Sequence, residues 1–313
     1  MTENPKFKII NTCPSCGNKL ELNWFLFKKK KAEYFKCANC NLIYQNPQPV
    51  FELSQDIYDG DHYHNRYIQS EYIYFPTSNI YLKEIENNFQ RLNYNSSGAK
   101  LLDVGCGIGY FLYLTKKKGY YVQGADISKW AGDYAKKHFD VDVITGNFLE
   151  IEFKENYYDV ITIWQTIEHL PEPGLFLEKI YSILKPGGYL CVATPDTNSW
   201  IAKFYKKLWN CYIPDEHICL FNFKSMKIIL ERFSFNPIVI KRIHERQFIP
   251  EQYEYLKLFI IRVIKNIVLK TYIFKPLFEQ KIIKRWEAQT DLEIPLPSIA
   301  YSVLSIARKE INV

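Results

Sequence analysis

Apolar and polar residues alternate along most of the chain in a pattern that predicts a mixed α/β fold. From Lys100 onward, short apolar runs are separated by longer segments in which apolar residues recur every three or four positions. Short apolar runs are typical of buried strands, and the longer period is typical of amphipathic helices. The strands expected from these runs are residues 101–104, 121–124, 141–144, 160–164, 189–193 and 299–307. This regular alternation predicts a doubly wound parallel sheet.

The residues before this region follow a different pattern. Residues 46–49, Asn-Pro-Gln-Pro, indicate a linker, because proline forces extended backbone on the residue before it. A helical period follows around Ile80, Ile85 and Phe89 and ends in a turn-forming cluster. We therefore expect three parts, which are a small N-terminal ribbon at 1–48, a linker with a helical lid at 49–97 and a main domain at 98–313.

The segment 247–297 interrupts the alternation between the last two expected strands, and we interpret it as an insertion. Within it, residues 251–286 carry eight Lys or Arg and three Glu, and their apolar residues recur with a helical period. One interpretation is an interfacial helix that makes peripheral contact with an anionic membrane. The other is a helix that packs on its own domain, or on a second subunit, with a solvated basic face.

The composition of the chain limits the cellular compartments and binding partners that can be expected. The net charge of +6 is too small to indicate nucleic-acid binding without a clustered basic face. No run of 18 apolar residues appears, so the sequence predicts no membrane span. Eight cysteines without an N-terminal export signal indicate a reducing compartment. We expect a cytoplasmic protein, peripheral at the membrane surface if residues 251–286 bind there.

Two cysteine pairs near the N-terminus predict a metal site. Cys13 and Cys16 form one Cys-x-x-Cys pair, and Cys37 and Cys40 form a second one 20 residues later. Four thiolates satisfy a closed tetrahedral zinc site, and a segment this short needs such a cross-link to fold. The alternatives are a redox pair and an iron centre of rubredoxin type. The interpretation that we favour is a structural zinc ribbon.

A glycine-rich loop follows the first expected strand of the main domain. Gly105, Gly107 and Gly109 stand at alternate positions, where the absence of a Cβ lets the backbone turn tightly and approach a ligand. Asp103 precedes the loop, and Asp126 ends the next strand, where a carboxylate can accept hydrogen bonds from ribose hydroxyls. The spacing differs from the dinucleotide-binding Gly-x-Gly-x-x-Gly, so it implies no pyrophosphate site.

Other runs continue a resemblance that begins at this loop. They are residues 146–148, 158–162, 165–170, 184–190 and 301–309. With the glycine loop, they resemble class I S-adenosylmethionine-dependent methyltransferases of the ubiquinone-biosynthesis type, from about residue 100 to residue 309. The resemblance implies a Rossmann-like seven-stranded, mostly parallel sheet with helices on both faces and an antiparallel last strand. It also implies S-adenosylmethionine as the methyl donor.

The same resemblance assigns residues to the donor. Asp103 would face the methionine amino group, Asp126 the ribose and Phe148 the adenine. An acid is common in the family where this chain has Asn147, so the contact with the adenine amino group differs here. The residues that the resemblance assigns to donor binding are Asp103, Gly105, Gly107, Gly109, Asp126, Ile127, Asn147, Phe148 and Gln165.

Methyl transfer to oxygen or nitrogen usually requires the acceptor to lose a proton, so a general base near the site is expected. Glu168 and His169 follow the fourth strand, where loops of such sheets face the ligand. His217 lies after the fifth strand, in a run that resembles a motif of the same family. His217 is the favoured base; the alternative is that it shapes the acceptor pocket. The Glu-His pair alternatively caps the next helix, and no spacing indicates a catalytic metal.

These observations predict methyl transfer to a small or carrier-linked acceptor, a hydroxyl of a sugar, glycan or lipid precursor. The first alternative is an RNA methyltransferase that grips its substrate with the zinc ribbon. Against it, residues 165–168 are Gln-Thr-Ile-Glu and not the Asn-Pro-Pro-aromatic run used on exocyclic base amines. The second alternative is a protein that binds the donor without catalysis and acts as a scaffold. The sequence predicts no oligomeric state.

Overall fold

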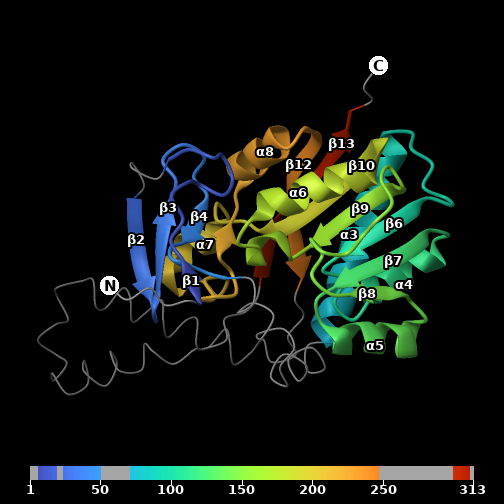
Figure 1. The fold of residues 1–313 in the computed structure, drawn as a ribbon, viewed down its shortest axis with the longest axis horizontal. Coiled ribbons are helices and arrows are strands. Elements are labelled where there is room, and N and C mark those ends of the chain that lie inside the picture. Colours follow the sequence, from blue (N-terminus) through green and yellow to red (C-terminus); the bar gives the residue numbers. More distant parts are fainter. Residues whose placement is uncertain (1–5, 20–23, 51–70, 247–298, 311–313) are drawn as a thin grey trace, which may run out of the picture. The chain divides into compact units, whose positions relative to one another are not determined.

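The computed structural model describes residues 6–19, 24–50, 71–246 and 299–310 (Figure 1). The chain divides into two compact units, residues 1–245 with 300–313, and residues 246–299. Nearly all described residues belong to the first unit, to which the following description applies. The insertion at 247–297 and the first part of the expected lid lie outside the described residues, so the interpretations given for them stay predictions.

The main sheet has seven strands in the order β12-β13-β10-β9-β6-β7-β8 (Figure 1). Its strands are β6 (Lys100–Val104), β7 (Tyr121–Asp126), β8 (Val143–Thr145), β9 (Tyr158–Trp164), β10 (Leu184–Pro195), β12 (Phe235–Arg246) and β13 (Ile299–Lys309). Neighbours from β10 through β8 pair in parallel, and β13 pairs antiparallel with β10. The predicted mostly parallel seven-stranded sheet, with its antiparallel last strand, is confirmed.

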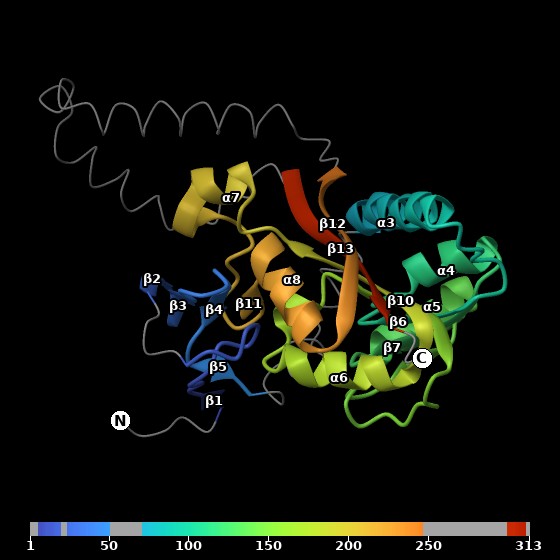
Figure 2. The ribbon, with the colours of Figure 1, turned by 90° about the horizontal axis from the view of Figure 1, so that it is seen from above.

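Helices cover both faces of this sheet (Figure 2). On one side lie α3 (Glu71–Arg91), α4 (Tyr110–Lys117) and α5 (Lys129–Phe139), and on the other lie α6 (Pro173–Ile183) and α8 (Phe223–Arg232). Alternate strand residues separate into two buried clusters, with Leu101 beside α3 and α4 and Leu102 beside α6 and α8. Because successive strand side chains point to opposite faces, one short apolar run supplies both cores.

Helix ends follow the expected local chemistry. The Ser128 hydroxyl accepts a hydrogen bond from the Ala131 amide at 3.3 Å and so caps the N-terminus of α5. Asn222 caps α8 in a reciprocal arrangement with Ser225. Among the described residues, no helix is long and apolar enough to cross a membrane.

The N-terminal residues form small strands around the cysteines. These are β1 (Phe7–Lys8), β2 (Trp24–Lys29), β3 (Ala32–Lys36), β4 (Ile43–Gln45) and β5 (Gln48–Pro49). Strands β2, β3 and β4 form a four-stranded sheet with β11 (Cys219–Leu220), a short strand of the main domain. Cys219 pairs with Tyr44, and Leu220 pairs with Ile43. The N-terminal module, residues 6–49, therefore shares a sheet with the main domain.

Candidate functional site

The glycine loop after β6 turns tightly and packs against the loop after β9. Gly105, Gly107 and Gly109 have φ values of 74°, 52° and 76°, in the left-handed region that favours glycine. A Cβ on Gly105 would lie 2.4 Å from the Thr166 hydroxyl oxygen, which is closer than Cβ atoms approach a non-bonded neighbour in proteins. The side chain at position 105 is thus excluded both by the backbone conformation and by the neighbouring loop.

Two carboxyl groups lie at the strand ends beside this loop. Asp103 is 2% exposed and accepts a hydrogen bond from the Thr162 hydroxyl at 2.6 Å. Burial, with the nearby charge of Asp126, raises the pKa of Asp103 to about 8. Asp126 accepts hydrogen bonds from the amides of Gly107 at 2.7 Å and Ser128 at 2.9 Å. Asp126 therefore fixes the end of β7 to the glycine loop.

The remaining residues assigned to the donor have varied surroundings. Ile127 is half-buried directly after β7. Asn147 closes the turn after β8, accepting from the Leu149 amide at 3.1 Å and donating to Glu150 at 3.0 Å. Phe148 is buried, and its ring stacks on Phe176 with centroids 5.3 Å apart. The donor role of each of these residues stays a prediction.

Gln165 binds side chains of two other elements. Its amide donates hydrogen bonds to the Tyr81 hydroxyl at 2.9 Å and the Ser302 hydroxyl at 2.8 Å. Gln165 has a φ of 48° and thereby turns the chain sharply after β9. These hydrogen bonds link the end of β9 to α3 and β13. The contact of Gln165 with the donor stays a prediction.

The three candidate catalytic residues come together in space. Glu168 and His169 lie in a short 3-10 helix (Ile167–His169) after β9, and His217 lies just before β11. One carboxylate oxygen and one nitrogen of each ring all lie within 4.8 Å of one another. The two imidazole rings meet edge to face, with centroids 4.6 Å apart. These residues were predicted individually from the sequence, and the cluster that they form was not predicted.

Backbone carbonyl groups fix the tautomers of both histidines. His169 Nδ1 lies 2.9 Å from the Glu216 carbonyl oxygen, and His217 Nδ1 lies 2.8 Å from the Cys211 carbonyl oxygen. Because a carbonyl oxygen only accepts, each Nδ1 must carry the hydrogen, and each neutral ring keeps an unprotonated Nε2. Glu168 is fully buried and accepts from the Thr194 hydroxyl at 2.9 Å. This donor set can accept a proton, and it could also hold a divalent metal.

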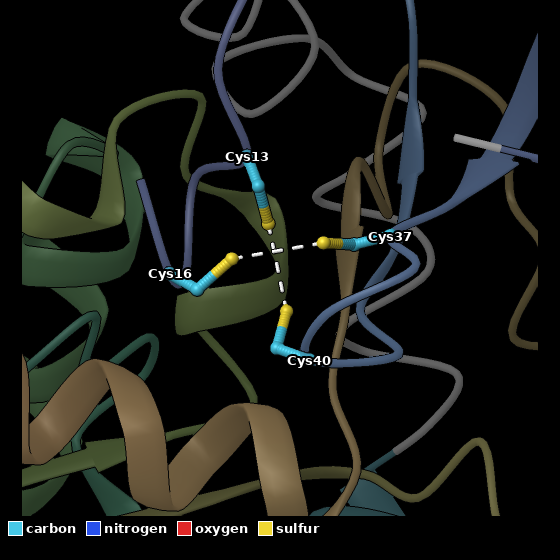
Figure 3. Close-up of side chains that lie close together, drawn as sticks. All are labelled: Cys13, Cys16, Cys37 and Cys40. Atoms are coloured by element: carbon cyan, nitrogen blue, oxygen red, sulfur yellow. Dashed lines mark hydrogen bonds between the residues drawn. The ribbon is translucent and has the colours of Figure 1, made fainter. Parts of the chain in front are cut away.

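The four N-terminal cysteines point toward a common centre (Figure 3). Cys13 Sγ lies 3.5 Å from Cys40 Sγ, and Cys16 Sγ lies 3.6 Å from Cys37 Sγ. A zinc ion with four Zn–S bonds of about 2.3 Å places its sulfurs about 3.8 Å apart, whereas a disulfide bond is about 2 Å long. None of these four cysteines forms a disulfide bond. The arrangement fits a four-thiolate metal site.

The two cysteine turns repeat one backbone pattern. The Gly17 amide donates to the Cys13 carbonyl at 2.9 Å, and the Asn41 amide donates to the Cys37 carbonyl at 3.0 Å. Gly17 and Asn41 both have left-handed φ values, 74° and 63°. The hydrogen bond with the Cys13 thiol lowers the pKa of Cys40. A thiolate favoured before metal arrives suits metal capture.

The sequence of the chain is similar to those of known methyltransferases. A family model described as a methyltransferase domain matches residues 78–239. A ubiquinone biosynthesis O-methyltransferase of Coxiella burnetii is 34% identical over 106 residues, which are 32% of this chain and 45% of that protein. The chain spans about half the length of the curated relatives that it matches.

Two solved structures resemble the fold at low sequence identity. One belongs to the complex between the Haloferax volcanii Trm112 methyltransferase activator and a methyltransferase, with a TM-score of 0.55, 16% identity, and coverage of 82% of this chain and 97% of that one. The other is magnesium protoporphyrin IX methyltransferase from Synechocystis PCC 6803 with bound SAH, with a TM-score of 0.54, 12% identity, and coverage of 83% and 100%. These likenesses support the fold alone.

Proposed function

Since the chain belongs to the methyltransferase-domain family, we propose that it transfers a methyl group from S-adenosylmethionine to a hydroxyl oxygen of a small or carrier-linked acceptor. A sugar, a glycan precursor or a lipid precursor would supply such a hydroxyl. The observation that carries the proposal is the cluster of Glu168, His169 and His217. The 3-10 helix with Glu168 and His169 begins directly after Thr166, which packs against Gly105 of the glycine loop. Methyl transfer from a sulfonium depends mainly on placing the acceptor in line with the methyl carbon.

The donor would bind across the glycine loop. The methionine part would lie along the tight turn that the left-handed backbone of Gly105, Gly107 and Gly109 makes, and Asp103 would face its amino group. Asp126 would hold the ribose hydroxyls while it keeps its contacts with the loop amides. Phe148, whose ring stacks on Phe176, would flank the adenine.

His217 would act as the general base. The methyl–sulfur bond breaks as the bond from the acceptor oxygen to the methyl carbon forms, and the hydroxyl proton passes to His217 Nε2. The Cys211 carbonyl holds the tautomer that leaves Nε2 unprotonated, and it then stabilises the charged ring. The buried carboxylate of Glu168 lies close enough to favour that positive charge.

The four cysteines would hold a structural zinc ion. Four thiolates complete its coordination, so the ion would have no open position for substrate or water. Its contribution would be to cross-link the turn at Cys13–Cys16 to the turn at Cys37–Cys40. Three of the four cysteines belong to the same buried cluster as residues of α6 and α8, so this cross-link would stabilise the main domain as well.

The test is transfer of label from methyl-labelled S-adenosylmethionine to a cell extract, fractionated into small molecules, lipids, glycans, RNA and protein. Label in the small-molecule, lipid or glycan fraction supports the proposal. Label that ribonuclease releases supports the RNA alternative instead. Donor binding without any label supports the non-catalytic alternative.

The variant His217→Asn removes the proposed base and keeps its hydrogen bond to the backbone. The Asn amide can still donate to the Cys211 carbonyl, whereas Nε2 is gone. Donor affinity, measured by calorimetry, should stay within about twofold, and label transfer should fall by about 100-fold or more. Normal transfer by this variant would rule out His217 as the base.

A further inference from the structure

The segment that carries His217 is fastened to the N-terminal module at several points. Strand β11, directly after Ile218, completes the module's sheet by pairing with β4. The Gln45 backbone amide of β4 donates to the Ile218 carbonyl at 2.9 Å. Ile218 in turn donates its amide to the Glu168 carbonyl at 2.9 Å. One short run of backbone therefore joins the cysteine module to two members of the catalytic cluster.

The Gln45 side chain makes a reciprocal pair with Asp215. Its Nε2 donates to Asp215 Oδ1 at 2.7 Å, and its Oε1 accepts from the Asp215 backbone amide at 3.0 Å. The second hydrogen of Nε2 goes to the Pro47 carbonyl at 3.2 Å. Gln45 is 1% exposed, and a buried amide with these partners has little freedom to move.

Asp215 is the residue from which the turn to His217 begins. Its φ of 68° lies in the left-handed region, which side chains other than glycine adopt at some cost. The amides of Glu216 and His217 then both donate to the Ile213 carbonyl, at 3.3 and 2.9 Å. The side-chain amide of Gln45 thus stabilises the turn conformation that positions the backbone of His217.

The other end of this turn also rests on the module. Tyr212 packs against both Phe27 and Tyr34, with its ring centroid 4.8 and 5.3 Å from theirs. Lys29 donates to the Tyr212 carbonyl at 2.7 Å. Cys211, whose carbonyl fixes the His217 tautomer, is the residue before Tyr212. The module therefore holds the turn on both sides of the histidine.

The cysteine turn determines where Gln45 stands. Strand β3 ends at Lys36, Cys37–Cys40 form the turn, and β4 begins at Ile43. Tyr34 of β3 pairs with Gln45 of β4 in the resulting register. A change in the Cys37 turn would shift the register of β4, and with it the amide that holds Asp215.

We propose that Gln45 is a positioning residue for His217, through which the cysteine module fixes the orientation of the catalytic turn. The proposal rests on the role proposed above for His217 as the base. It gives the module a task in acceptor activation that does not require the module to touch donor or acceptor.

The test compares Gln45→Met with a matched control, Gln48→Met. Both glutamines are 1% exposed and lie in the module, but Gln48 donates to Cys219 Sγ at 3.7 Å and not to Asp215. Methionine keeps the length and apolar stem of glutamine and removes both hydrogen bonds of the pair. Each variant is first checked for zinc content and for S-adenosylmethionine affinity, which should stay within about twofold of the parent because the glycine loop is untouched.

The main readout is the ¹⁵N spectrum of the histidine rings, with His217 assigned from the His217→Asn variant. The parent and Gln48→Met should show the tautomer with the hydrogen on Nδ1, and Gln45→Met should show a shift toward a mixture of tautomers. Amide hydrogen exchange over residues 211–218 should be about tenfold faster in Gln45→Met. An unchanged His217 signal and unchanged exchange in Gln45→Met would overturn the proposal.

A double variant that exchanges the carboxylate and the amide of this pair tests whether the turn can be restored. Gln45→Glu alone should disturb the turn, because the introduced carboxylate would repel that of Asp215. Combining Gln45→Glu with Asp215→Asn restores the hydrogen bond between the two side chains with donor and acceptor exchanged, and it keeps an oxygen for the backbone amide at position 215. The double variant should regain the parent signal and bring exchange to within about threefold of it.

Gln45→Glu and the double variant both lack the hydrogen bond to the Pro47 carbonyl, so the difference between them isolates the pair with Asp215. Equal exchange in these two variants would overturn the proposal even if Gln45→Met does not fold. The histidine spectrum and the amide exchange need no acceptor, so they report on the turn whether or not the base is correctly assigned. Normal methyl transfer by His217→Asn would therefore refute the base alone, and the two failures can be told apart.

Discussion

Asp103 should make the ligand-free protein less stable as the pH rises. Burial raises its pKa to about 8 in the folded protein, whereas an unfolded chain has an aspartate pKa of about 3.9. Between these values the folded state binds a proton that the unfolded state has lost. The free energy of unfolding therefore decreases by about 1.4 kcal/mol per pH unit from this one group, by about 6 kcal/mol in total, and the decrease ends above pH 8.

The variant Asp103→Asn removes the titration and keeps an oxygen to accept the Thr162 hydrogen bond. Its stability advantage over the parent should grow by about 1.4 kcal/mol per unit between about pH 5 and pH 8 and then stay constant. Urea unfolding of the ligand-free proteins at several pH values measures this difference. The control is Asp133→Asn, because the Asp133 side chain is 70% exposed and its removal should leave the pH dependence unchanged.

Parallel pH profiles for the parent and Asp103→Asn would refute the reasoning, since they would mean that Asp103 ionises alike in both states. A second measurement tests the assigned partner. If Asp103 faces the donor's amino group, donor binding below about pH 8 should release a proton, seen as a dependence of the calorimetric heat on the buffer. Asp103→Asn should lack that release and bind the donor more weakly.

Three further changes test the rest of the site. Gly105→Ala should lower the free energy of unfolding by about 1–3 kcal/mol more than Gly98→Ala. Both glycines have similar φ values, 74° and 75°, but only a Cβ at Gly105 would collide with Thr166. Equal losses of stability would show that the Thr166 side chain moves aside. Asp126→Ala should abolish donor binding in calorimetry, and near-normal affinity would contradict the ribose assignment. Chelation or Cys37→Ser should release zinc, detected by mass spectrometry, and lower the melting temperature while leaving donor binding largely intact; lost donor binding would mean that the module contributes to the donor site.

The periodic parts of the fold could be predicted from sequence, and the cooperation between distant loops could not. The apolar runs at β6, β7 and β9 stand out because a buried parallel strand needs several apolar residues in succession. Strand β11 has two residues and carries no periodic signal of its own. Its pairing with β4 was therefore not predicted, and the N-terminal module was expected to end at its linker.

The candidate site shows the same division. The glycine loop and the cysteine pairs are local motifs, so their spacing indicated their geometry. His169 and His217 meet where the Ile218 amide, just before β11, donates to the Glu168 carbonyl of the 3-10 helix after β9. Gln45 carried no signal at all, since a buried amide in a three-residue strand resembles any polar residue until its partner is known.

The shared sheet also has a consequence for how the chain folds during synthesis. Gln45 and Asp215 are 170 residues apart in sequence, so β4 emerges from the ribosome long before the strand that pairs with its open edge. Contacts of such long range form late, and an open strand edge invites pairing with other chains in the meantime. Zinc bound early by the cysteine turns would keep the small hairpin folded through this interval. The main domain would then fold onto a preformed template.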